Sequence, residues 1–162
     1  MNFFEFALEL EKKTIESYRS LAEKCESNEG VKNILLMLAD DHEKHAKILE
    51  EMQNNAAVEM EETEAFREAR ELFSNMQEDK TPFSCEIDQL KLYEDARVLV
   101  QKKLQLYLDI VEKMDTEENK TLVKKMAEEE KKQAVVLGHI IEMVSRPQSW
   151  LEDAEFHHLD EY

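Results

Sequence analysis

Apolar residues recur every three or four positions along four long segments of this chain, and this spacing limits what it can fold into. One such stripe contains Val31, Leu35, Leu38, His42, His45, Leu49 and Met52. A stripe of this kind gives a helix one apolar face, which must be buried against other helices. Glycine and proline, which interrupt helices, occur only twice each in 162 residues. The pattern therefore predicts an all-α protein built from long helices.

Turn and capping signals predict where these helices begin and end. The expected long helices span about 2–27, 31–55, 86–114 and 117–145. Gly30 is expected to end the first of them, and Thr116 to cap the start of the last. Long helices of this kind most often form an antiparallel four-helix bundle with one long crossover.

The crossover is expected at about 56–85, with a shorter helix of its own at about 61–78. We expect the bundle to occupy residues 1–147. A C-terminal tail, 148–162, would then pack through Trp150 and Phe156 on the bundle or on a dimer partner.

The two halves of the sequence resemble each other. The segment LEKKTIESYRSLAEK (10–24) aligns with LVQKKLQLYLDIVEK (99–113), which places Tyr18 at the position of Tyr107. LADDHEKHAKIL (38–49) then aligns with MAEEEKKQAVVL (126–137). This internal similarity predicts two pseudo-repeated helix pairs.

Each apolar stripe is interrupted near its middle by polar residues. These are Glu11, His42, His45, Arg97, Glu130 and Gln133. Burying an unpaired charge costs about several kcal/mol, so these groups are expected to meet each other or a shared cation. His42 and His45 are three residues apart on one helix face, so both can reach a single ion.

This arrangement resembles the rubrerythrin-type branch of the ferritin-like superfamily, over residues 1–145. In that family each half supplies a Glu followed seven residues later by a Tyr, and a Glu-x-x-His on its second helix. Glu11 with Tyr18 matches the first element, while His45 and Glu130 match parts of the second. The resemblance implies a ferritin-like bundle with two iron ions, a homodimer, and redox chemistry linked to peroxide or dioxygen. Because the sequence has no Cys-x-x-Cys pair, electrons would have to come from a separate donor.

Three positions depart from the family pattern: His42 and Val100 replace glutamates, and Gln133 replaces a histidine. The two remaining carboxylates balance one divalent ion. We therefore predict a mononuclear site for iron, or alternatively zinc or manganese. Its expected ligands are Glu11, His42, His45 and Glu130, with Gln133 as a weaker one and with Tyr18, Tyr107 and Arg97 around them.

Two alternatives follow from the same residues. The ion could hold the bundle together in a non-enzymatic metal-binding or sensing protein. Alternatively, the Arg97 guanidinium could pair with Glu11 or Glu130, replace the metal charge, and leave a metal-free interaction module. Arg97 could also extend its charged end to the edge of the bundle.

Charge and cysteine content narrow the classes of partner. A net charge of −17 disfavours nucleic acid and anionic membranes as partners. The N-terminal stretch MNFFEFALELEKK carries acids within its apolar run, so it is expected to be neither a signal peptide nor a membrane span. Cys25 and Cys85 are too few for a metal knuckle or a disulfide framework, which makes the cytoplasm the expected location.

Overall fold

The computed structural model describes residues 3–25, 28–54, 65–79, 90–146 and Trp150. The helices are α1 (Phe3–Lys24), α2 (Glu29–Gln53), α3 (Ala65–Glu78), α4 (Leu90–Ile110), the 3-10 turn η2 (Val111–Lys113) and α5 (Glu117–Ser145). The all-α prediction is confirmed. The predicted helix ends at residues 2, 27, 55 and 86 lie outside the described residues.

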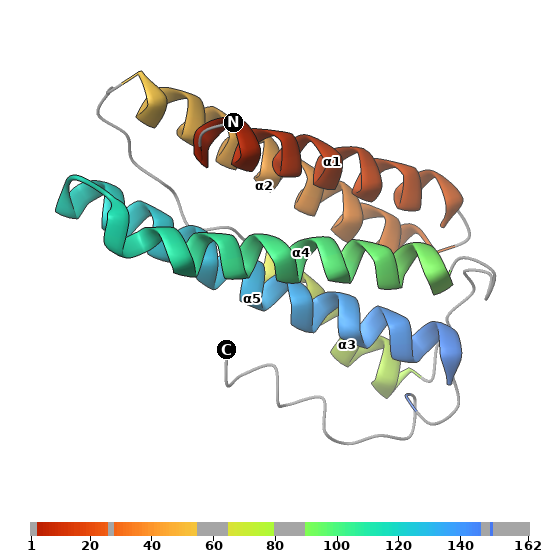
Figure 1. Cartoon of the computed structure of the whole chain (residues 1–162). Coiled ribbons are helices and arrows are strands. Elements are labelled where there is room, and N and C mark those ends of the chain that lie inside the picture. The colour runs from red at the N-terminus through yellow and green to blue at the C-terminus, as the bar shows by residue number, and fades with distance from the viewer. Residues whose placement is uncertain (1–2, 26–27, 55–64, 80–89, 147–149, 151–162) are drawn as a thin grey trace.

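The four long helices form two antiparallel pairs, α1 with α2 and α4 with α5 (Figure 1). The pairs pack with α1 against α4 and α2 against α5. Since α2 and α4 run in the same direction, the chain must return along the bundle between them (Figure 1). The shorter α3 lies in this crossover and packs against α2 and α5. This is the expected four-helix bundle.

The start of α2 differs from the prediction. The Asn28 side chain caps α2 by accepting a hydrogen bond from the backbone N–H of Val31 at 3.1 Å, so Gly30 lies within the first turn instead of ending α1. A Cβ at Gly30 would lie 2.7 Å from Leu72 Cδ1, so glycine allows α3 to approach closely. The predicted cap at Thr116 is confirmed, because its hydroxyl accepts from the N–H of Asn119 at 3.1 Å.

Two apolar clusters make up the core. One lies toward the α1–α2 turn and includes Leu21, Leu35, Phe73, Tyr93 and Ile140. The other lies toward the opposite end and includes Ala7, Leu49, Tyr107, Val123 and Met126. Between them is a layer of buried polar residues, namely Glu11, Thr14, His42, His45, Lys103, Glu130 and Gln133. We call these seven residues the polar layer.

Trp150 is the one described residue beyond Arg146. Its side chain is buried, its ring lies against Phe73 of α3, and its Nε1 donates a hydrogen bond to His139 Nδ1 at 3.2 Å. The remainder of the predicted tail, including Phe156, lies outside the described residues.

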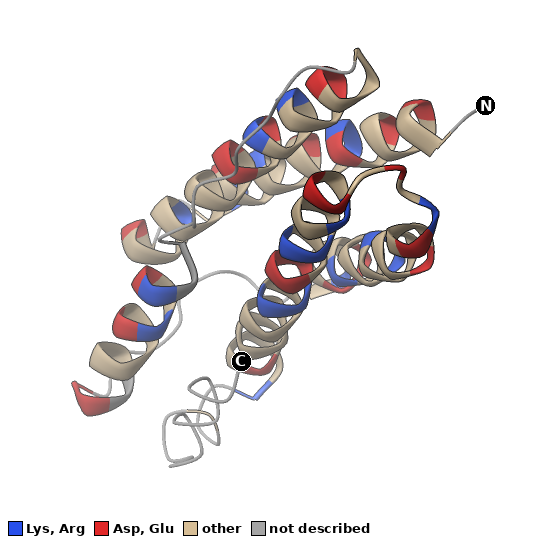
Figure 2. Cartoon of the chain, turned by 90° about the vertical axis from the view of Figure 1, so that its left-hand side faces the viewer, with Lys and Arg blue, Asp and Glu red and all other residues tan. Residues whose placement is uncertain are grey.

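Two observations bear on the expected location of the protein. Acidic and basic residues are interspersed along the helices (Figure 2), and no described helix has an apolar stretch that could cross a membrane. Cys25 is disulfide-bonded, and Cys85, the other cysteine of the sequence, lies outside the described residues. The cytoplasmic location stays a prediction.

Candidate metal centre

The structure brings the four predicted ligands together at the middle of the bundle. One donor atom from each of Glu11, His42, His45 and Glu130 lies within 4.8 Å of the others. All four side chains are buried. They come from three helices: α1 supplies the first, α2 the two histidines, and α5 the last.

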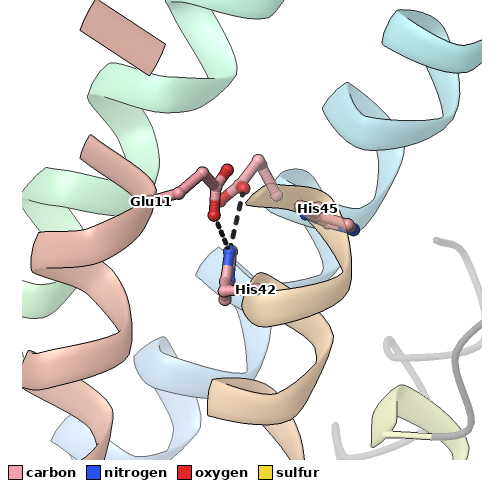
Figure 3. Close-up of side chains that lie close together, drawn as sticks. Glu11, His42 and His45 are labelled. Atoms are coloured by element: carbon pink, nitrogen blue, oxygen red, sulfur yellow. Dashed lines mark hydrogen bonds and ion pairs between the residues drawn. The ribbon is translucent and has the colours of Figure 1, made fainter. Parts of the chain in front are cut away.

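Glu11 is held from several sides. The Tyr107 hydroxyl donates to Glu11 Oε1, and His42 Nδ1 lies 2.6 Å from Oε2 (Figure 3). Burial by itself would raise the pKa of this carboxyl group. The nearby Lys103 and His42 outweigh burial and hold the pKa of Glu11 well below its ordinary value of 4.5. Glu11 is therefore a carboxylate at neutral pH.

Gln133 orients His42. His42 Nε2 lies 2.6 Å from Gln133 Oε1, and the Tyr18 hydroxyl donates to the same oxygen at 2.8 Å. An amide oxygen can only accept, so Nε2 carries a proton and Nδ1 is the nitrogen that faces the centre. The oxygen of Gln133, predicted as a weaker ligand, is thus occupied by two donors.

Lys103 is a member of the centre that the sequence interpretation missed. Its ammonium nitrogen lies 3.2 Å from Glu11 Oε2, 2.9 Å from Glu130 Oε1 and 2.8 Å from His42 Nδ1. The sequence prediction named Val100 and Tyr107 of α4 but not Lys103. The structure buries all three, at the spacing of one helix face. The signal available in the sequence was that lysine lies one turn after Val100.

Arg97, which one of the two alternatives paired with the carboxylates, lies elsewhere. Its guanidinium is beside Gly138 of α5, where a Cβ would come within 3.5 Å of Nη2. Among the ion pairs of the described residues, none joins Arg97 to Glu11 or Glu130. The positive charge that we expected from Arg97 is instead supplied by Lys103, from a position closer to the middle of the bundle.

Several polar atoms of the centre lack hydrogen-bond partners within the described part of the chain. They are His45 Nδ1, Gln133 Nε2 and Glu130 Oε2, whereas Glu130 Oε1 is paired with the Lys103 ammonium at 2.9 Å. Burial, with smaller contributions from His42 and Lys103, lowers the pKa of His45 to about 3, so its imidazole is neutral. Burial raises the pKa of Glu130 despite Lys103. Glu130 Oε2 and a neutral His45 Nδ1 can therefore offer lone pairs, whereas the amide nitrogen of Gln133 is a hydrogen-bond donor without an acceptor.

His42 Nδ1 has two neighbours that require opposite protonation states of this nitrogen. A proton on Nδ1 would bond to Glu11 but would face the Lys103 ammonium, whereas a lone pair would accept from Lys103 but would face the carboxylate. Burial and Lys103 lower the pKa of His42, but Glu11 and Glu130 raise it more, so the net shift is upward. Both contacts cannot be hydrogen bonds at once.

The comparison with known families identifies this architecture. A family model described as Rubrerythrin matches residues 2–137, which include every residue of the polar layer. The chain belongs to the rubrerythrin family. No curated protein and no solved structure matched it. Membership agrees with the bundle and its crossover, and it makes a metal the first ligand to test at the centre.

The residues of this rubrerythrin-family centre do not fit two iron ions. Two divalent ions together with the Lys103 ammonium would face only two carboxylates, Glu11 and Glu130. The excess positive charge would be buried, at a cost of several kcal/mol per ion by the usual order of magnitude. One divalent ion fits better: together with Lys103 it exceeds the two carboxylates by about one positive charge, against about three for two ions, and two neutral imidazoles complete the donor set.

Proposed function

We propose that the chain binds one divalent metal ion at the middle of its bundle, through Glu11, His42, His45 and Glu130. The observation that carries this proposal is the convergence of four buried donor groups from three helices, with one donor atom of each within 4.8 Å of the rest. Carboxylates and imidazoles are ligands that iron, zinc and manganese accept.

A bound ion would also remove the conflict between the two contacts of His42 Nδ1. Nδ1 of His42 and Oε2 of Glu11, 2.6 Å apart, would then both act as lone-pair donors to one cation. His45 Nδ1 and Glu130 Oε2, which lack hydrogen-bond partners among the described residues, could do the same. A metal therefore matches the donors that the hydrogen-bond network leaves unused.

The finer proposal is that the bound metal is iron and supports redox chemistry with peroxide or dioxygen. Its support is membership in the rubrerythrin family, together with the sequence resemblance. When bound, iron would supply the one-electron steps of such chemistry. This chain would supply the buried pocket, the hydroxyl groups of Tyr18 and Tyr107 beside it, and no electron donor of its own.

The experiment is elemental analysis of protein purified without an affinity tag or chelators, beside a His42→Ala/His45→Ala double variant. About one iron, zinc or manganese per chain, absent from the double variant, would support the proposal. Two ions per chain would contradict the charge argument. No metal in either protein after reconstitution with ferrous iron under anaerobic conditions would refute metal binding.

The redox proposal needs its own measurement. Peroxide reduction by the iron-loaded protein should be lost in Glu11→Ala, since the variant removes one of the two carboxylates. A metal-loaded protein that is more thermostable but shows no turnover would indicate the non-enzymatic binding or sensing role instead.

One observation favours a second candidate, a metal-free bundle. Lys103 already contacts both carboxylates at 2.9–3.2 Å, so it could supply the positive charge that the metal-free alternative assigned to Arg97. The protein would then act through its surface, as an interaction module. Chelators would leave its stability unchanged, which separates this candidate from the first.

A further inference from the structure

The position of the Lys103 ammonium is the position that an ion would need. The ammonium nitrogen lies within 3.2 Å of three donor atoms: Oε2 of Glu11, Oε1 of Glu130 and Nδ1 of His42. Three of the four proposed metal ligands therefore already hold a cation. That cation is part of the chain and is fully buried.

The ammonium and a divalent ion cannot share these ligands. Both would lie within about 3 Å of the same oxygens, which brings two positive charges close together inside a region shielded from water. With Glu11 and Glu130 as the only carboxylates of the polar layer, a divalent ion alone balances their charge, and the ammonium beside it would add an excess positive charge. The geometry thus allows either cation at this point, one at a time.

We infer that Lys103 is a built-in competitor of the metal ion. Its ammonium occupies the centre when the ion is absent, and the ion binds only by displacing it. The four-carbon stem with its rotatable bonds gives the ammonium the freedom to withdraw. This inference rests on the proposed metal site and deepens it, because it names the residue that sets how much metal is needed to fill the site.

The test compares zinc binding by calorimetric titration of the metal-free whole chain and its variants. Lys103→Met removes the ammonium while keeping an unbranched side chain, and we expect zinc to bind at least about tenfold more tightly to it. Lys102→Met is the matched control, since Lys102 is the exposed neighbour on the same helix, and it should bind zinc as the wild type does. Adding His42→Ala/His45→Ala to Lys103→Met should abolish the gain.

Each outcome is decisive. Tighter binding confined to Lys103→Met supports the competitor role. Zinc binding by the variant alone also supports it, while refuting metal binding by the natural chain. Equal affinity in the wild type and the variant overturns the inference and leaves the metal site intact. Binding by neither protein overturns both. If Lys103→Met does not fold, Lys103→Gln, which retains a hydrogen-bonding end, takes its place in the same comparison.

Discussion

The two halves of the bundle carry different chemistry at equivalent positions. In the aligned repeats, Glu11 of the first half corresponds to Val100 of the second, and Thr14 corresponds to Lys103. In the second aligned segment, His42 and His45 correspond to Glu130 and Gln133. The first half therefore supplies three of the four candidate ligands. The second half supplies one carboxylate, one amide and a cation.

The tyrosines are the part of the centre that the halves share. Tyr18 reaches across to Gln133 of the second half, and Tyr107 reaches across to Glu11 of the first. The crossed hydroxyl groups show that the paired architecture is retained while the groups at its centre have diverged. An equivalent position in a repeat thus predicts where a side chain lies better than it predicts its chemistry.

Removing the cation of the second half should have the largest effect on stability. Lys103→Met leaves two buried carboxylates, Glu11 and Glu130, without the ammonium that contacts both. Breaking a buried ion pair from one side costs about 3–5 kcal/mol, and we expect a loss of that size in the metal-free protein. Urea unfolding measures it. The exposed Lys102→Met should stay within about 0.5 kcal/mol of the wild type, and a similar loss in both variants would contradict the assignment.

The two carboxylates should differ when each is replaced by an amide. Glu11 accepts from Tyr107 and contacts His42 and Lys103, so Glu11→Gln should lower the free energy of unfolding by about 2–3 kcal/mol. Glu130 contacts Lys103 at 2.9 Å, but burial raises its pKa despite this contact, so Glu130→Gln should cost less, about 1 kcal/mol. Chemical unfolding of the two metal-free variants tests this, and equal losses would remove the distinction.

The difference in the free energy of unfolding between the wild type and Glu11→Gln should change with pH in a defined direction. The folded-state pKa of Glu11 is depressed below 4.5, because Lys103 and His42 together outweigh the raising effect of burial. The stability that its carboxylate contributes is thus present above that value and is lost as the pH falls further. The gap between the wild type and Glu11→Gln should therefore narrow in acid. A gap that widens below pH 4.5 would contradict the direction of the shift.

The tyrosines should differ by a smaller margin. Tyr107 donates to the charged Glu11, and Tyr18 donates to the neutral amide oxygen of Gln133. We expect Tyr107→Phe to cost about 1.5–3 kcal/mol and Tyr18→Phe about 0.5–1.5 kcal/mol, following the usual values for charged and neutral acceptors. Thermal unfolding of the two variants at one pH compares them directly. The reverse order would mean that Glu11 is not the charged acceptor.

Replacing the helix-capping residues should lower the free energy of unfolding least, and by the same amount in the two halves. Asn28 caps α2, and Thr116 caps α5, each by accepting a backbone N–H from three residues ahead. Replacing either by alanine should cost about 1 kcal/mol, because the cap is local and does not involve the polar layer. Urea unfolding curves of the two variants should nearly coincide. A several-fold larger loss at one cap would show that the halves also differ outside the centre.

Local rules explain which parts of this molecule could be predicted from its sequence. The helices follow from apolar spacing and from caps such as Thr116, and the convergence of His42 and His45 with Glu11 and Glu130 follows from their places on apolar stripes. Lys103 could not be predicted in the same way. Lysine is almost never fully buried unless paired, so a lysine between Val100 and Tyr107 is expected at the surface. A rotation of α4 by one residue position decides whether Lys103 is buried, and only packing fixes that rotation.

The polar layer also governs how the helices are aligned along the bundle axis. Between two apolar clusters, a helix with a uniform stripe could slide by one heptad, about 10 Å, and still bury apolar side chains. With the layer in place, such a slide would carry Lys103 away from Glu11 and Glu130 into hydrocarbon surroundings. The slipped bundle would then bury three unmatched charges. Whichever cation the centre holds, the polar layer therefore favours one alignment of the four helices along the bundle axis.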